Sequence, residues 1–291
     1  MNIVSGFISG VNGRSDRDLT KYVALGKELM SCEIPMTIFL EKSVFQAHFV
    51  KWIGSETGRG EFVHKCEGGV LDGMRYKYYY SVFGHITVVF FEKTDLFLWP
   101  YQSMASRFSL NTGNPGKDTL GYMMVQCQKT EWVSIASGLV GGIGRRGGMG
   151  GIGRRGGRGE TYVWLDFGIF HMFHGKIDVF QTEMYRLRGR IKRKGVDGKI
   201  TAARCWDPAR MAVGDIYKDV CWLFAGSVFG GREDAIQRFA RLMREKCFCL
   251  LREKNSLMWE INVWALIYRE VPELFALYPS DHSEIIVRGW T

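Results

Sequence analysis

The sequence predicts an α/β fold, in which a mostly parallel sheet is flanked by helices, in a single domain with a C-terminal helical portion. Two observations predict it. Apolar strand segments alternate with helical segments through the first two-thirds of the chain, and the last third contains two amphipathic helices. The 291 residues, 46% hydrophobic and 24% charged, are enough for a substantial core. No linker rich in proline or serine interrupts residues 1–291, so we expect one domain.

Four apolar segments predict the strands of the sheet. Ile86–Phe91 and the apolar part of 162–166 have almost no polar alternation, which is typical of strands buried on both faces. The four segments are Ile3–Ile8, Met36–Leu40, Ile86–Phe91 and Tyr162–Asp166. A further segment, 220–229, is apolar and interrupted by glycine.

Helices are predicted where apolar residues recur at helical spacing. Between Leu19 and Met30, the residues Tyr22, Leu25, Gly26 and Leu29 share one face. The other expected helices cover residues 44–52, from 118 to about 135, 233–252 and 257–269.

A formal net charge of +9 raises the question of nucleic-acid binding, but much of the positive charge lies in two short segments. Residues 138–159 contain five arginines and no acid, as a tandem repeat of Gly-Gly-Ile-Gly-Arg-Arg-Gly-Gly. So much glycine predicts a flexible surface insertion. This insertion is either a slipped repeat between two elements or an RNA-binding arm of the Gly/Arg kind.

The second basic segment, 185–194, alternates apolar and basic residues and precedes Gly195-Val-Asp-Gly198. This pattern predicts an exposed β-hairpin with one solvated face. Such a face is either simply solvated or turned toward an anionic substrate.

Cysteine usage and the apolar runs bear on the cellular environment. The seven cysteines are scattered and include no Cys-x-x-Cys pair, which favours reduced thiols over a disulfide framework or a zinc site. No apolar run reaches the length of a membrane span, and the first residues lack the features of a signal peptide. We therefore expect a cytoplasmic protein without a transmembrane segment.

Asp166 is the first candidate functional residue, because it stands at the end of a predicted buried strand. Ligands of open α/β sheets bind at the carboxyl ends of the strands. Its carboxylate is therefore either a capping or ion-paired structural group, or a ligand for a metal and phosphate.

At this point the chain resembles a known family. Its segment Trp164-Leu-Asp-Phe-Gly168 is similar to the Trp-[Ile/Leu]-Asp-x-Gly motif of the HtrL/YibB-like (WlaTC-type) proteins, which are grouped with GT-A glycosyltransferases. The segments 114–129, 22–39 and 278–282 are also similar to parts of that family. The resemblance covers nearly the whole chain apart from residues 138–159. It implies a GT-A-like (Rossmann-like) fold and transfer of a sugar from a nucleotide-diphosphate donor to a glycan, lipid or protein acceptor.

Sugar transfer from a diphosphate needs positive charge to stabilise the leaving group, and a divalent metal usually provides it. Asp166 is the candidate ligand of Mn²⁺ or Mg²⁺, but Gly168 stands where the usual Asp-x-Asp motif has its second acid. Two explanations remain open. His282, similar to a late histidine of GT-A enzymes, completes the metal shell, or Arg14, Lys117 and Lys129 neutralise the phosphates directly. The alternatives are an exposed loop histidine at position 282 and solvated surface charges at the three basic residues.

Catalysis with inversion also needs a base for the acceptor hydroxyl. Glu260 is the candidate, since it lies among aromatic residues that could stack on a sugar; the alternative is a structural pair with Arg269. The segment around Gly226 and Ser227 resembles the glycine-containing segment that lines the donor-sugar pocket of GT-A enzymes. The alternative is that its glycines allow tight packing between a helix and a strand.

Two further functions compete with sugar transfer. One is an RNA-associated protein that uses the Gly/Arg-rich insertion on a non-catalytic α/β core. The other is a hydrolase in which Asp166 acts with His171 and His174, although the zinc motif His-Glu-x-x-His is missing.

Overall fold

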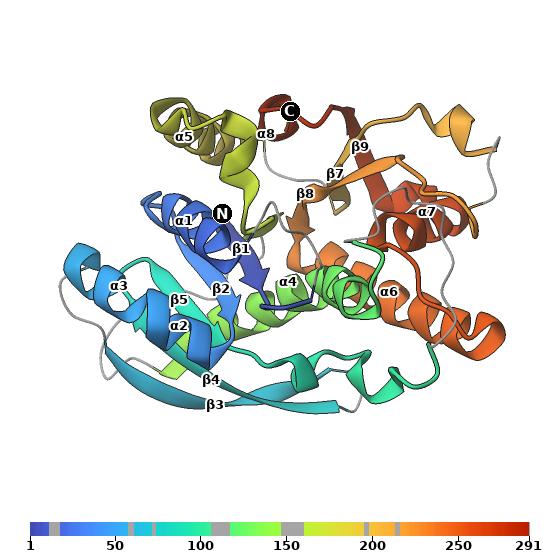
Figure 1. Ribbon diagram of the computed structural model, residues 1–291. Coiled ribbons are helices and arrows are strands. Elements are labelled where there is room, and N and C mark those ends of the chain that lie inside the picture. The colour runs from blue at the N-terminus through green and yellow to red at the C-terminus, as the bar shows by residue number, and fades with distance from the viewer. Residues whose placement is uncertain are drawn as a thin grey trace.

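The computed structural model describes residues 1–11, 18–57, 61–71, 74–105, 117–146, 160–194, 198–212 and 216–290. Within these residues, nine strands form one sheet in the order β3-β4-β5-β2-β1-β6-β8-β7-β9 (Figure 1). The strands are β1 (Asn2–Phe7), β2 (Met36–Leu40), β3 (Glu61–Leu71), β4 (Met74–Phe83), β5 (Ile86–Phe90), β6 (Thr161–Leu165), β7 (Ile200–Arg204), β8 (Phe224–Arg232) and β9 (Phe275–Pro279). The predicted α/β class is confirmed.

The sheet is mostly parallel, as expected, but two strands are reversed. Its central part, β5-β2-β1-β6, is parallel throughout. Strands β4 and β8 run antiparallel to both of their neighbours. Because β2 and β6 lie on opposite sides of β1, a crevice is expected between the carboxyl ends of β1 and β6.

Helices cover both faces of the sheet and enclose two cores. One face carries α1 (Leu19–Met30), α2 (Lys42–His48), α3 (Val50–Thr57), α5 (Ile177–Lys194) and α8 (Ile285–Arg288), and the other carries α4 (Leu120–Arg146), α6 (Glu233–Lys254) and α7 (Glu260–Glu270) (Figure 1). Successive strand residues point to opposite faces, so Ile3 joins the core under α1 and Val4 joins the core under α4. No helix of the described part is long and apolar enough to cross a bilayer.

Several elements have the bounds that the sequence predicts. Helix α1 occupies residues 19–30 and strand β2 occupies residues 36–40. The side chain of Asp18 caps α1 by accepting a hydrogen bond from the backbone N–H of Lys21. The helix expected at 44–52 is instead two consecutive helices, α2 and α3, which meet at Phe49.

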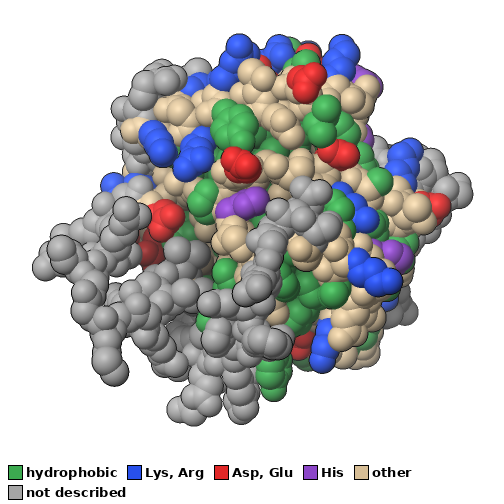
Figure 2. Space-filling model, turned by 90° about the vertical axis from the view of Figure 1, so that its left-hand side faces the viewer, with side chains coloured by type: hydrophobic (Ala, Val, Ile, Leu, Met, Phe, Trp, Pro, Cys, Tyr) green, Lys and Arg blue, Asp and Glu red, His purple; other side chains and the backbone are tan. Residues whose placement is uncertain are grey.

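The hairpin predicted from the basic segment 185–194 is wrong, since these residues continue helix α5. The buried residues Phe180, Met184, Leu187 and Ile191 follow a helical spacing that starts before the basic segment. Apolar and basic residues alternate over the last part of this helix, and such alternation is also typical of a strand. Lys and Arg side chains gather along the top of the face in Figure 2, where α5 and α8 lie in Figure 1.

The loop predicted for residues 138–159 is also wrong in its first part. Helix α4 continues to Arg146, so residues 138–146 are helical despite their four glycines. The preceding residues of α4, 129–137, are buried, and a helix that is already formed adds further residues more easily than it starts. The second copy of the repeat, with Arg154, Arg155 and Arg158, lies outside the described residues.

Candidate functional site

A cleft of about 180 Å³ lies at the carboxyl ends of β1 and β6. The end of β1 contributes Gly6, Phe7 and Ile8, and the turn after β6 contributes Asp166 and Phe167. This is the place where the strand order of the sheet predicts a ligand crevice. The cleft therefore lies where the sequence placed the function of Asp166.

The cleft brings together most of the residues that the sequence analysis selected. They come from the segment before α4, from α4 itself, from the ends of β6 and α7, from β8 and from the segment after β9. Of the residues expected to serve sugar transfer, those that line the cleft are Lys117, Lys129, Asp166, Ser227, Glu260 and His282. Arg14 lies outside the described residues.

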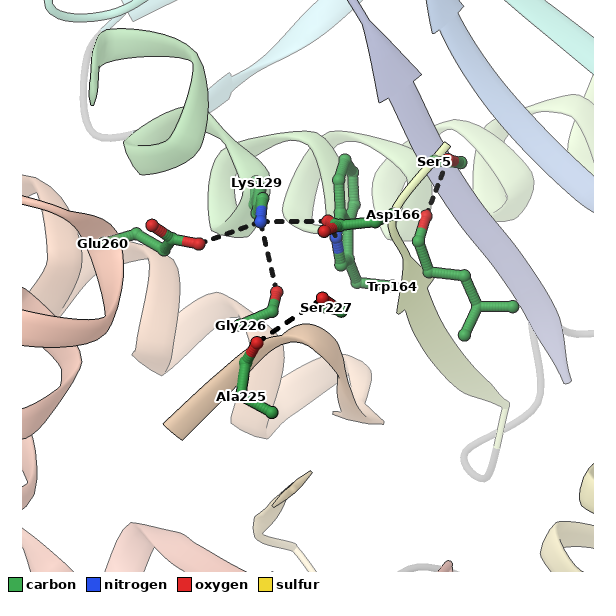
Figure 3. A network of polar contacts seen from close by, with 9 residues as sticks. Ser5, Lys129, Trp164, Asp166, Ala225, Gly226, Ser227 and Glu260 are labelled. Carbon is green, nitrogen blue, oxygen red and sulfur yellow. Dashed lines mark hydrogen bonds and ion pairs between the residues drawn. The ribbon is translucent and has the colours of Figure 1, made fainter. Parts of the chain in front are cut away.

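Lys129 stands at the centre of a polar network (Figure 3). Its Nζ atom lies 2.9 Å from Oδ1 of Asp166 and 2.9 Å from Oε1 of Glu260. The same ammonium donates a hydrogen bond of 3.2 Å to the backbone carbonyl of Gly226. Lys129 thus joins β6, β8 and α7, and its side chain is only 3% exposed.

Burial and ion pairing act in opposite directions on the pKa values of this network. Burial of the Lys129 ammonium favours its neutral form, but Asp166 and Glu260 outweigh burial and raise the pKa of Lys129. Burial likewise favours the protonated form of Asp166. The charge of Lys129 and hydrogen bonds from Lys129, Trp164 and Ser227 outweigh it, so the pKa of Asp166 is lowered. The pair is charged at neutral pH.

Trp164 orients the carboxylate of Asp166. Its indole Nε1 donates a 2.8 Å hydrogen bond to Oδ1 of Asp166. The indole itself is stacked on Trp132 with an interplanar angle of 15°. The backbone N–H of Asp166 also donates to the carbonyl of Ser227, at 3.0 Å. Asp166 is therefore both ion-paired and one-third exposed at the cleft, which combines the two alternatives that its sequence position left open.

Gly226 is required by the close approach of α7 to β8. Its φ of +68° lies in the left-handed region, which non-glycine residues rarely adopt. A Cβ atom at this position would lie 2.8 Å from Oε1 of Glu260. The glycine therefore allows Glu260 and Lys129 to meet beside the strand.

Glu260 is the first residue of α7, a position where the helix dipole favours a carboxylate. Its side chain is 5% exposed and pairs with Lys129. The alternative partner considered from the sequence, Arg269, instead donates a hydrogen bond to the carbonyl of Met211. Glu260 faces the cleft rather than the protein surface.

Helix α1 shapes the other wall through close packing at Gly26. A Cβ atom there would lie 2.1 Å from the Phe167 ring, so only glycine lets the ring pack this close to the helix. The Phe167 ring also stacks on Phe7, which in turn contacts Tyr22. The turn that carries Asp166 is thus held between β1 and α1.

Aromatic residues form another wall of the cleft, as expected beside Glu260, but the sequence does not single out Trp222. The Lys117 ammonium lies 5.5 Å from the centre of the Trp259 ring. Trp222 contacts both Trp259 and the imidazole of His282, the latter at 5.2 Å. Burial and then the nearby positive charge of Lys117 lower the pKa of His282. The sequence around Trp222 has no pattern of apolar residues that predicts its contacts with Trp259 and His282.

The two histidines after the Asp motif do not act as a pair. His171 lines the cleft, where its Nδ1 lies 2.5 Å from the carbonyl of Gly168. His174 adopts a left-handed backbone conformation at the end of a short 3₁₀-helix, 169–173, and does not line the cleft. Asp166, His171 and His174 therefore form no joint site in the structure.

The donor set fits a divalent metal poorly. Among the described residues, no group of three or more His, Cys, Asp or Glu side chains is arranged to hold a metal ion. Both carboxylates that could be ligands, Asp166 and Glu260, are bound by the ammonium of Lys129. A metal at these oxygens would have to displace Lys129 or share its partners against charge repulsion.

In comparisons with known proteins, no family model matches the chain, and no curated protein or solved structure matches it either. The resemblance to HtrL/YibB-like proteins stays a prediction from the sequence.

Proposed function

We propose that the chain is a glycosyltransferase with a GT-A-like fold, which moves a sugar from a nucleotide-diphosphate donor to a glycan, lipid or protein acceptor. The observation that carries this proposal is the meeting of Lys117, Lys129, Asp166, Ser227 and Glu260 in one cleft at the β1–β6 crevice. Glycosyl transfer needs cationic groups beside a leaving diphosphate and a carboxylate beside the acceptor.

The donor half of the reaction uses the cationic and hydroxyl groups of the cleft. Breaking the bond from the sugar C1 to the diphosphate leaves negative charge on the departing phosphate oxygen. Lys117 stands on the open aromatic wall, where its ammonium can pair with that charge. Asp166 keeps a third of its side chain exposed and can accept hydrogen bonds from donor hydroxyls.

The acceptor half of the reaction uses Glu260. As the acceptor oxygen bonds to C1, its proton must move to a base, and Glu260 is the cleft carboxylate on the side of α7. The aromatic rings of Trp259 and Trp222 lie next to it and offer stacking surfaces for a sugar. Lys129 holds in place both the carboxylate of Asp166, on the donor side, and the carboxylate of Glu260, on the acceptor side.

A thermal-shift panel tests the proposal. UDP-, GDP- and CMP-sugars are added to the full chain, because a ligand that binds the native state raises the melting temperature. We expect one nucleotide series to stabilise the protein, and Asp166→Asn to weaken that effect. The control Asp234→Asn, on an exposed surface acid, should behave like the unchanged protein. The absence of stabilisation by every donor would contradict the proposal.

A further inference from the structure

The position of Lys129 has the properties of a cation site. An ammonium group has three N–H donors and no acceptor. In this structure three oxygens surround it: Oδ1 of Asp166, Oε1 of Glu260 and the carbonyl of Gly226. Two carboxylates and a backbone carbonyl are also the oxygen ligands that Mg²⁺, Mn²⁺ and Ca²⁺ prefer.

We propose that Lys129 is the resident cation of the cleft, standing where the donor oxygens would otherwise hold a divalent metal, and that the cleft binds nucleoside diphosphates without one. The inference rests on the proposed function for its ligand, but its claim about the carboxylates does not need that function. Lys129 is a positioning residue here, because it acts through Asp166 and Glu260.

The surroundings of Lys129 keep it in this position. Its side chain is 3% exposed and comes from the middle of α4, a helix that packs against both β1 and β6. The ammonium also lies 5.9 Å from the centre of the Trp164 ring, a distance at which cation and ring attract each other. All three N–H donors of Lys129 thus have an oxygen partner inside the protein.

A second cation beside Lys129 would be strongly disfavoured. Any metal bound to the same carboxylate oxygens would lie within a few ångströms of the ammonium, and like charges repel strongly in a partly buried site. Removing the ammonium reverses this situation, because Asp166 and Glu260 would then be two uncompensated carboxylates beside a carbonyl. The inference therefore predicts that loss of Lys129 creates a metal site.

Manganese binding tests the inference without any nucleotide. Free Mn²⁺ is measured by electron paramagnetic resonance during titration of the full-length unchanged protein, Lys129→Ala, the double variant Lys129→Ala with Asp166→Asn, and Lys199→Ala. Lys199 is an exposed lysine and serves as the matched control. We expect only Lys129→Ala to gain one Mn²⁺ ion, with an affinity at least tenfold higher than the other three proteins. Circular dichroism checks that each variant is folded.

A second experiment tests the inference even if the Lys129→Ala variant does not fold. The unchanged protein and Asp166→Asn should show the same Mn²⁺ titration, and stabilisation by UDP, GDP or CDP should persist in excess EDTA. One Mn²⁺ ion bound by the unchanged protein and lost in Asp166→Asn would overturn the inference. Nucleotide stabilisation that vanishes in EDTA and returns with Mn²⁺ would also overturn it, while leaving the proposed function intact. No nucleotide binding in either buffer would count against the proposed function, not against the Mn²⁺ result.

Discussion

The indole N–H of Trp164 donates a hydrogen bond to Oδ1 of Asp166, two residues farther along the chain. Trp164 therefore belongs to both the core and the cleft: its ring stacks on Trp132, and its N–H holds the carboxylate that Lys129 binds. Since the carboxylate is charged, this hydrogen bond is stronger than one between neutral groups.

Trp164→Phe separates these two roles. Phenylalanine keeps a ring against Trp132 but removes the N–H donor. Losing a hydrogen bond to a charged group should lower the free energy of unfolding by roughly 1.5–3 kcal/mol. Urea denaturation measures this change. Phe229→Leu, in the same core beside Trp164, is the comparison variant: it should lower stability without altering donor binding, whereas Trp164→Phe should weaken both.

Glu260→Gln should slow transfer by about 10²- to 10⁴-fold, the usual contribution of a general base. Donor binding should be retained, because the amide oxygen can still accept a hydrogen bond from Lys129. Initial rates with acceptor, together with donor titrations, separate the two effects. Glu273→Gln, at an exposed surface glutamate, provides the control. Equal losses in rate and donor affinity would show that Glu260 is structural.

We expect Gly226→Ala to distort the site, because alanine strains the backbone at this position and its Cβ crowds Glu260. A left-handed conformation costs a non-glycine residue about 1–2 kcal/mol. The new Cβ would also lie 2.8 Å from Oε1 of Glu260, so the carboxylate must move away from Lys129. We expect loss of both stability and turnover.

Gly138→Ala is the matched control for Gly226→Ala. Gly138 is an exposed residue of α4, and a Cβ there meets nothing within 4 Å. Alanine should stabilise this helix by roughly 0.5–1 kcal/mol. Thermal unfolding of the two variants should therefore shift in opposite directions, and a shift in the same direction would contradict the helical placement of Gly138 or the strain at Gly226.

The lowered pKa of Asp166 predicts a particular loss of stability in acid. A carboxyl group whose pKa is lower in the folded protein stabilises the fold above its unfolded pKa, near pH 4. That stabilisation is lost as the pH falls through the folded pKa. The unchanged protein should therefore lose more stability below about pH 4 than Asp166→Asn does. Urea unfolding at a series of pH values measures the difference. If the free energy of unfolding falls equally with pH in both proteins, the pKa of Asp166 is not lowered in the folded state.

Much of the central fold could be predicted because its signals are local. Strand β2 is a short apolar run after Pro35, and α1 has an amphipathic face and an Asp18 cap. The alternation of residues 185–194 alone predicts a hairpin, whereas the buried Phe180 and Met184 show that a helical spacing runs into this segment. The sequence does not predict strands β3, β4, β7 and β9.

The candidate site could be predicted only in part, since its pairings depend on tertiary structure. Asp166 and Lys129 were selected from strand position and charge, and both line the cleft. That Lys129 binds Glu260, 131 residues away in the sequence, follows from the packing of α4 beside α7 and has no local pattern. Lys129 was therefore expected to neutralise phosphates, whereas the structure pairs it with two carboxylates.

The most direct test of the account is a turnover assay with whichever nucleotide sugar stabilises the protein. Release of the nucleoside diphosphate is measured for the unchanged protein, for Asp166→Asn and for the control Asp234→Asn. If the carboxylate at the end of β6 holds the donor, Asp166→Asn should reduce the rate by about 10²-fold or more, and the control should not. Equal rates in all three proteins would contradict the account.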